Sequence, residues 1–359
     1  MMKVAFVLLF AAYAYGCGTP SYQPLMSRVV NGEDARPNSW PWQVSLQFRL
    51  FSVYIHNCGG TLLTPNWVLT AAHCIGPTYR VVLGKHDLTK EEGYEQIISV
   101  EKTVVHPNFD INCPPCGNDI AMIKLASPAE LNDKVQPSCV PQSGEIPPHN
   151  DPCYITGWGR ISTNGPAASK LQQALLPVVD YDTCSRRDWW GNSVRTTMVC
   201  AGGDIRSGCS GDSGGPLNCK GADEKWYVQG ITSFVSGLGC NTIKKPTVFT
   251  RTSSFTDWIA DLLILHVLSS LENDAVVSLL PPAVEHPELS RGGWMEMGEG
   301  GGGSGCAFKQ LEDPSSWRRG NNFQVDKGER RRGGTINVMK SAPSVSPGLE
   351  HGRGEADLL

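Results

Sequence analysis

The chain has 359 residues, of which 40% are hydrophobic, and its formal net charge at pH 7 is −4. That length suffices for one or two domains with buried cores. A mildly acidic chain offers no basic surface to favour nucleic acid, so we expect no nucleic-acid partner.

The first sixteen residues have the composition of a secretory signal. Lys3 precedes an apolar run from Val4 to Ala12, and Ala14–Gly16 supplies small residues at the positions where a signal peptidase acts. A membrane anchor is the weaker alternative, because this run and every later one are too short to span a bilayer. We predict that residues 1–16 are a signal peptide, and that the protein is secreted and not associated with a membrane.

A secreted chain folds where disulfides persist, so its thirteen cysteines are interpreted first as covalent crosslinks. Twelve of them lie between Cys17 and Cys240, an even number that permits complete pairing. Cys306 stands apart and is expected to be a free thiol. We expect no bound metal and no cofactor.

Short apolar runs, many of them β-branched, alternate with turn residues between about Val29 and Leu268. Helical periodicity is almost absent before Ser254–Leu265. The pattern predicts an all-β barrel or sandwich closed by a C-terminal helix, with enough chain for two six-stranded barrels. The predicted strands are Gln43–Phe48, Gly60–Leu63, Trp67–Thr70, Arg80–Leu83, Gln96–Val100, Ile120–Leu125, Cys153–Gly157, Trp226–Ser233 and Thr247–Arg251.

Residues 208–216, Gly-Cys-Ser-Gly-Asp-Ser-Gly-Gly-Pro, place a hydroxyl nucleophile at Ser213 among glycines that leave backbone N–H groups exposed. A serine hydroxyl needs a neighbouring base and a third group that orients the base. The candidates are His73, in Ala-Ala-His-Cys after a predicted strand, and Asp119, in Asn-Asp-Ile-Ala before one. Taken singly, a histidine beside a cysteine or an aspartate before a strand more often has a structural role. Together, in the order His, Asp, Ser, they predict an acyl-transfer site.

The segments 71–74, 118–121 and 211–216 resemble the three signatures of the chymotrypsin-like serine proteases. The resemblance extends from Cys17 to about Leu263. It implies a fold of two antiparallel six-stranded β-barrels with the site between them, and a serine endopeptidase.

The same resemblance assigns roles to the candidate residues. It implies that His73 is the general base, that Asp119 orients it, and that Ser213 is the nucleophile. It also implies an oxyanion hole formed by the backbone N–H groups of Gly211 and Ser213.

The stretch Ser27–Gly32 resembles the activation junction of the family. Cleavage after Arg28 by a trypsin-like enzyme would free the amino group of Val29 to pair with Asp212. Before cleavage this carboxylate would lack a cation, so the adjacent loop should be poorly formed. We therefore expect a zymogen with a propeptide at 17–28.

The resemblance also implies a set of disulfides, which spacing alone does not establish. A Cys17–Cys139 bridge would keep the propeptide attached after cleavage. Cys113-Pro-Pro-Cys116 has redox-active or metal-binding spacing, but we favour a small structural bridge because no βαβ pattern surrounds it. The implied pairs are Cys17–Cys139, Cys58–Cys74, Cys113–Cys116, Cys153–Cys219, Cys184–Cys200 and Cys209–Cys240.

The resemblance places the substrate pocket between Ser207 at its floor and Val235 and Thr247 at its sides. A serine at the floor argues against a preference for Lys or Arg. The branched side chains leave room for a small apolar group, as in pancreatic elastases, and other motifs resemble the elastase III or protease E branch, which favours alanine. The substrate backbone is expected to pair with the strand containing Ser233, Phe234 and Val235.

The chain departs from the family pattern in two places. Elastases of this family often bind calcium in the loop that corresponds to Lys85–Glu95, using a carboxylate at its start, where this chain has Lys85. An ammonium group cannot ligate a cation and could take the place of the ion by pairing with Glu95, so the sequence does not decide whether this loop binds calcium. The second departure is an atypical tail at 269–359, rich in Gly, Ser, Pro and charge, for which we expect disorder. The protease domain is expected at 29–268.

Three alternatives stay open at this point. A lipase or esterase also carries G-x-S-x-G, but its triad follows the order Ser, Asp, His. A binding protein built on an inactive protease scaffold would have lost a triad residue, and all three are present. A variant isoform with impaired folding or activity would keep the same motifs. We expect a monomer whose partners are polypeptide substrates, a trypsin-like activating protease and serine protease inhibitors.

Overall fold

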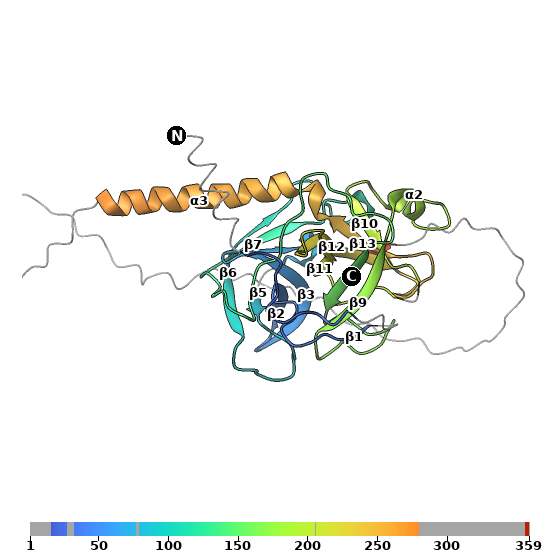
Figure 1. Ribbon diagram of the computed structural model, residues 1–359, viewed down its shortest axis with the longest axis horizontal. Coiled ribbons are helices and arrows are strands. Elements are labelled where there is room, and N and C mark those ends of the chain that lie inside the picture. The colour runs from blue at the N-terminus through green and yellow to red at the C-terminus, as the bar shows by residue number, and fades with distance from the viewer. Residues whose placement is uncertain (1–15, 27–31, 77–78, 205, 280–355, 359) are drawn as a thin grey trace, which may run out of the picture. The chain divides into compact units, whose positions relative to one another are not determined.

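The first half of the chain closes into an antiparallel barrel. The computed structural model describes residues 16–26, 32–76, 79–204, 206–279 and 356–358 (Figure 1). Six strands close the first barrel in the order β2-β3-β4-β7-β6-β5. They are β2 (Gln43–Leu50), β3 (Val53–Thr64), β4 (Trp67–Thr70), β5 (Tyr79–Leu83), β6 (Gln96–Val105) and β7 (Ala121–Leu125).

The second half of the chain forms an eight-stranded antiparallel sheet in which β8 pairs with both β9 and β11. This double pairing closes six of the strands into a second barrel. Two short strands, β1 (Glu33–Asp34) and β14 (Ala356–Leu358), pair with β9 and β12. The six barrel strands are β8 (Pro152–Gly157), β9 (Gln172–Val179), β10 (Met198–Ala201), β11 (Pro216–Lys220), β12 (Trp226–Ser236) and β13 (Thr247–Arg251). The predicted pair of six-stranded barrels is confirmed.

A continuous apolar core joins the two barrels. Trp40 packs edge-on against Trp226 of the second barrel, with ring centroids 4.8 Å apart. Both Trp40 and Trp42 are buried and donate their indole N–H groups to side chains of the second barrel, Gln173 and Asn218. Buried indoles that find such partners fix the orientation of neighbouring elements. These buried contacts therefore fix the orientation of one barrel against the other.

The short helices connect strands, and the longest helix follows β13. This helix, α3 (Thr256–Leu279), begins near the predicted start but continues well past Leu265. The stretch after Leu265 has neither glycine nor proline before Pro281, so nothing in it stops propagation of the helix. The others are α2 (Tyr181–Cys184), η1 (Ala72–Cys74), η2 (Pro114–Cys116), η3 (Gly191–Ser193) and η4 (Thr252–Ser254).

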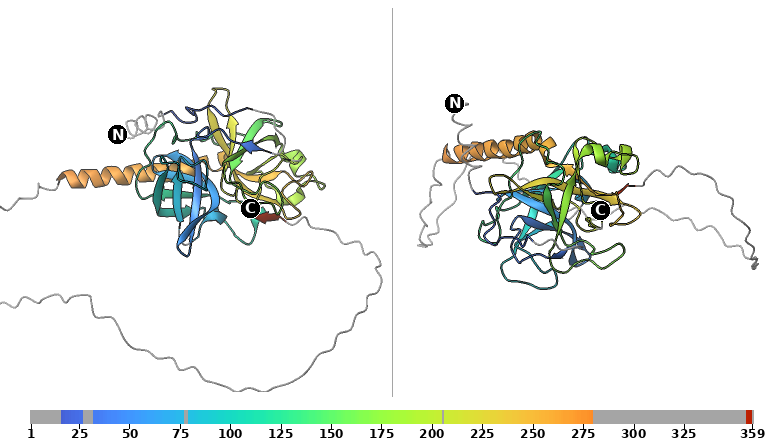
Figure 2. Two further views of the ribbon diagram at one scale, coloured as in Figure 1. Left: turned by 90° about the horizontal axis from the view of Figure 1, so that it is seen from below. Right: turned by 45° about the vertical axis from the view of Figure 1, so that its right-hand side comes forward.

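The structure describes two short pieces of the predicted 269–359 tail, one at each end of it. α3 extends to Leu279, and Ala356–Leu358 forms β14 beside the second barrel (Figure 2). Backbone pairing with an available strand edge supplies hydrogen bonds that composition does not reveal. The domain boundaries at 28/29 and 268/269 stay predictions. Residues 1–15 of the predicted signal, the junction residues Arg28 and Val29, and Cys306 lie outside the described residues.

Strands β9, β10 and β11 were not predicted. β9 contains Pro177, β11 begins with Pro216, and proline usually marks a strand edge. β10 has only four residues. Among the described helices, none is long and apolar enough to cross a membrane.

Candidate active site

His73 and Asp119 meet where two strands of the first barrel lie side by side. η1 carries His73 just after β4, and Asp119 lies just before β7, which pairs with β4 through Thr70 and Ala121. The Nδ1 atom of His73 lies 2.7 Å from Oδ2 of Asp119, and the backbone N–H of His73 donates to Oδ1 at 3.0 Å. The carboxylate therefore fixes both the ring and the backbone of the histidine.

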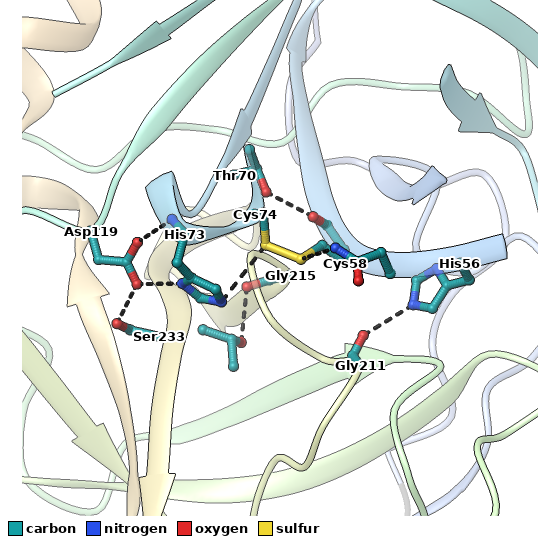
Figure 3. The surroundings of a disulfide bond; sticks show 12 residues. His56, Cys58, Thr70, His73, Cys74, Asp119, Gly211, Gly215 and Ser233 are labelled. Carbon is teal, nitrogen blue, oxygen red and sulfur yellow. Dashed lines mark hydrogen bonds and ion pairs between the residues drawn. A yellow bond between two sulfur atoms is a disulfide. The ribbon is translucent and has the colours of Figure 1, made fainter. Parts of the chain in front are cut away.

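Two residues of the second barrel hold Asp119 from the opposite side. The Ser233 hydroxyl donates to Oδ2 at 2.5 Å, and the Thr250 hydroxyl donates to the backbone carbonyl of Asp119 at 2.8 Å. Burial alone would raise the pKa of Asp119, but the charge of His73 and the donors from His73 and Ser233 hold it below its usual range. The carboxylate is thus ionised although it is buried. Figure 3 shows His73 and Ser233 hydrogen-bonded to it.

Ser213 is fixed by backbone hydrogen bonds to both barrels. Gly59 N–H donates to the Ser213 carbonyl at 2.7 Å, and Gly214 N–H donates to the carbonyl of Thr232 at 2.8 Å. Gly214 has φ 72°, and a Cβ there would lie 2.2 Å from the Thr70 hydroxyl oxygen. Only glycine fits this position, because both the conformation and the close approach exclude a side chain.

His56 supports the loop beside Ser213 and was not predicted from the sequence. Its Nε2 atom donates to the carbonyl of Gly211 at 3.0 Å, and the Ser45 hydroxyl lies 2.8 Å from its Nδ1. Burial lowers the pKa of His56 to about 4, so the ring is neutral at pH 7. Because a carbonyl only accepts, Nε2 carries the proton and Nδ1 accepts from Ser45. A single histidine on a strand gives no sequence signal for this role.

The Asp212 carboxylate is enclosed beside the glycine-rich loop. It accepts backbone N–H groups from Gly159 and Cys209, each at 2.9 Å. Burial raises the pKa of Asp212 to about 6, and these two donors only partly oppose the shift. A cavity of about 60 Å³ adjoins it, with Gly32 and Ser207 among the residues that line the space. Val29, the expected partner, lies outside the described residues.

The predicted pocket residues Ser207 and Thr247 contact one another. Their hydroxyl oxygens lie 2.8 Å apart, and the N–H of Gly208 donates to the Thr247 hydroxyl at 2.8 Å. Thr247 and Val235 are buried. Phe234 packs edge-on against Trp190, with ring centroids 5.3 Å apart. The hydroxyl groups of Ser207 and Thr247 therefore satisfy one another, and neither residue carries a charge.

The twelve cysteines of the described region form six disulfides, which are the pairs implied by the resemblance. Cys58–Cys74 lies directly beside His73 (Figure 3). Among described residues, the two groups of His, Cys and acidic side chains close enough to share a metal both contain disulfide sulfurs, which are not free to ligate. The pairs are Cys17–Cys139, Cys58–Cys74, Cys113–Cys116, Cys153–Cys219, Cys184–Cys200 and Cys209–Cys240.

An ammonium group lies among the carboxylates of the 85–95 loop. Lys85 Nζ lies 2.5 Å from Glu95 Oε1 and 3.8 Å from Glu92 Oε2. Glu95 also accepts the backbone N–H groups of Glu92, Gly93 and Tyr94. Partial burial would raise the pKa of Glu95, but Lys85 and the N–H donors lower it to about 2. This donor set does not fit calcium, because a cation already occupies the centre of the loop and the carboxylate oxygens are engaged.

Comparisons with known proteins agree with this geometry. The sequence model of the family described as Trypsin matches residues 29–259. The chain is 58% identical over 270 residues to chymotrypsin-like elastase family member 3B of Homo sapiens, a match that covers 74% of this chain and all of that protein. It is 60% identical over 241 residues to proproteinase E of Bos taurus, covering 66% of this chain and 95% of that one.

Proposed function

This chain belongs to the trypsin family and is an elastase-like serine endopeptidase, and we propose that it is a secreted digestive enzyme, made as a zymogen, that cleaves polypeptides after small uncharged residues, preferably alanine. The observation that carries the catalytic part is the buried pair of His73 and Asp119, to which Ser233 adds a hydrogen bond across the two barrels. A histidine that is oriented by a carboxylate can serve as the general base for a serine nucleophile.

In the proposed reaction the Ser213 hydroxyl oxygen attacks the carbonyl carbon of the scissile bond while its proton passes to Nε2 of His73. Negative charge develops on the carbonyl oxygen, where the N–H groups of Gly211 and Ser213 would stabilise it. The C–N bond then breaks, and His73 returns the proton to the leaving amine. Water, deprotonated by His73, attacks the acyl-enzyme and releases the acid. Asp119 holds Nδ1 of His73 protonated throughout.

The pocket residues support a preference for small side chains. The methyl groups of Thr247 and Val235 fill space that a larger side chain would need, and Ser207 supplies no carboxylate for Lys or Arg. One methylene changes selectivity by only about 1–3 kcal/mol, so cleavage after Val or Leu should follow as a weaker activity.

Activation by cleavage after Arg28 is supported by the environment of Asp212. A buried carboxylate whose pKa is raised lacks a cation, and the cavity beside it borders Gly32, which follows the junction in sequence. The new amino group of Val29 would supply that charge. The name of the bovine relative, proproteinase E, also denotes a proenzyme. A trypsin-like activator, polypeptide substrates, serine protease inhibitors, a monomeric state and secretion belong to the same proposal.

The experiment compares the purified protein before and after treatment with trypsin. We expect labelling by a fluorophosphonate at Ser213 only after cleavage, and faster hydrolysis of peptides with Ala before the scissile bond than of matched peptides with Phe or Lys. The Arg28→Gln variant should resist activation. Absence of labelling after confirmed cleavage at Arg28 contradicts the enzyme proposal, whereas a preference for Phe contradicts only the proposed specificity.

A further inference from the structure

We propose that the segment Ala356–Leu358, near the end of the chain, is an internal inhibitor that occupies the strand edge on which a substrate backbone would pair. The proposal rests on the proposed function, because it concerns access to the same site. β14 belongs to the same compact unit as the two barrels and lies beside the second of them (Figure 2).

β14 takes an edge of β12 that no barrel strand covers. β11 pairs with β12 only as far as Ile231, and β12 continues to Ser236. On its other edge, β12 pairs with β13, where Phe234 faces Val248. Beyond Ile231, only Thr232 still pairs on this edge, through Gly214 and Gly215 of the nucleophile loop. The β12 residues after Thr232 therefore offer a strand edge to which another strand can be added.

The register places β14 on the residues expected to bind the substrate backbone. β14 is antiparallel to β12, and the paired residues are Phe234 with Leu358, Val235 with Asp357, and Ser236 with Ala356. Two of these β12 residues, Phe234 and Val235, belong to the predicted substrate-binding strand. A substrate and β14 would need the same N–H and C=O groups, so they exclude one another.

The paired segment begins one residue from the catalytic machinery. Ser233, which donates to Asp119, immediately precedes Phe234, and Thr232 hydrogen-bonds with Gly214 and Gly215 of the nucleophile loop. Because β14 is antiparallel, its chain runs toward Ser233 as it passes from Ala356 to Leu358. On a second side β14 contacts η2, the turn closed by Cys113–Cys116. β14 therefore lies between β12 and η2, beside the site, as a bound peptide would.

β14 would compete with the substrate backbone for the edge of β12 without distorting the catalytic groups. The His73–Asp119 hydrogen bond is intact while β14 is paired. Because the segment is tethered, its pairing is intramolecular, so even three weakly paired residues can reduce access without a high concentration of free peptide. Release of β14 would restore access in one step. The expected kinetic signature is a raised KM with kcat unchanged.

The test compares two proteins that are each cleaved after Arg28 and shown by mass spectrometry to keep an intact tail. One is the unmodified full chain and the other is the Ala356→Pro/Asp357→Pro double variant. Successive N–H groups of a strand point to opposite sides, so two adjacent prolines remove at least one N–H that faces β12. With a peptide ending in Ala, we expect KM to be about tenfold lower in the double variant at unchanged kcat. Equal KM values in the two proteins would overturn the proposal.

A matched control carries the same two prolines just outside the paired segment. Gly352→Pro/Gly354→Pro leaves the N–H groups of β14 in place, so its KM should equal that of the unmodified chain. A lowered KM in this control would assign the effect to the tail in general and overturn the role of β14. If KM rises with enzyme concentration, β14 of one molecule inhibits a second molecule, and this would overturn inhibition within one chain.

A second readout does not depend on turnover. In the Ser213→Ala background, backbone amides of residues 234–236 should exchange hydrogen more slowly with the unmodified tail than with the double proline variant. Equal exchange contradicts the inhibitor proposal even if the enzyme is inactive. Fluorophosphonate labelling separates the two proposals. If neither the unmodified chain nor any proline variant is labelled after cleavage, the proposed function is contradicted. If all of them are labelled and have equal KM values, only the inhibitor role of β14 is contradicted.

Discussion

The backbone N–H of Gly59 donates to the carbonyl oxygen of Ser213 at 2.7 Å. Gly59 follows Cys58, whose disulfide partner Cys74 follows His73. The nucleophile and the base, which come from different barrels, are therefore linked by one hydrogen bond and one disulfide. A Cβ at Gly59 would lie 2.8 Å from Cα of Gly215, so the approach of the two loops requires a glycine here.

Removal of the Cys58–Cys74 bridge should lower activity as well as stability. The bridge spans 16 residues, and a loop of that size stabilises by about 3 kcal/mol on the chain-entropy model. Cys184–Cys200 also spans 16 residues and is the matched control, since it has no link to His73. We expect Cys→Ser pairs at both bridges to lower the midpoint of thermal unfolding similarly, and only the first pair to reduce kcat. An equal reduction in kcat would contradict the link.

Replacement of Asp119 by Asn should nearly abolish turnover. The amide can present an N–H toward Nδ1 of His73, which favours the wrong tautomer, so the loss should amount to about two to four orders of magnitude in kcat. Ser233→Ala removes only one donor to the same carboxylate and should cost about 1.5 kcal/mol, or roughly tenfold in kcat/KM. Ser236→Ala, on the same strand, is the control. A loss at Ser236 equal to that at Ser233 would show a general effect on β12.

The sequence predicted the first barrel and the pairing of His73 with Asp119 better than it predicted what supports them. Strands such as β4 and β13 are short runs rich in β-branched and aromatic residues, so their limits were predicted without error. Pro177 and Pro216 concealed β9 and β11. The triad candidates lie in distinctive short motifs. His56 does not, because it is a polar residue on a strand whose partner, Gly211, lies far away along the chain. Likewise, pairing of β14 with β12 depends on an edge that exists only after folding.

Enlargement of the pocket should shift the preferred substrate. Val235→Gly combined with Thr247→Ser removes branched side chains and keeps the hydroxyl that accepts from Gly208. We expect the ratio of kcat/KM for Phe peptides to that for Ala peptides to rise by a factor that corresponds to about 1–3 kcal/mol. Thr247→Ser alone is the control and should have a smaller effect. An unchanged ratio in the double variant would show that neither side chain limits the pocket.

Loss of the Lys85 charge should lower the free energy of unfolding by an amount that depends on pH. The folded pKa of Glu95 is lowered to about 2, so its contribution to stability is present above its usual pKa and is lost as pH falls toward 2. Lys85→Met should reduce the free energy of unfolding at pH 7 and flatten this part of the pH dependence. Lys90→Met is the control, because its ammonium is exposed and pairs with Asp87. Calcium should not stabilise the unmodified protein, and a clear rise in the unfolding midpoint with calcium would contradict the assignment.

The charge of Asp212 should make the uncleaved protein less stable as pH rises. Its folded pKa of about 6 exceeds the usual value for aspartate, so the folded state binds the additional proton between about pH 4 and 6. Stability is therefore highest below the unfolded pKa and is lost as pH rises through 6, by about 3 kcal/mol for a shift of this size. The difference in unfolding free energy between Asp212→Asn and the unmodified zymogen should change by that amount over this range.

Cleavage after Arg28 should abolish this dependence on pH in the unmodified chain, because the Val29 ammonium would stabilise the carboxylate. The cleaved Asp212→Asn variant should remain poorly active. A trend that persists after cleavage would show that Val29 does not reach Asp212.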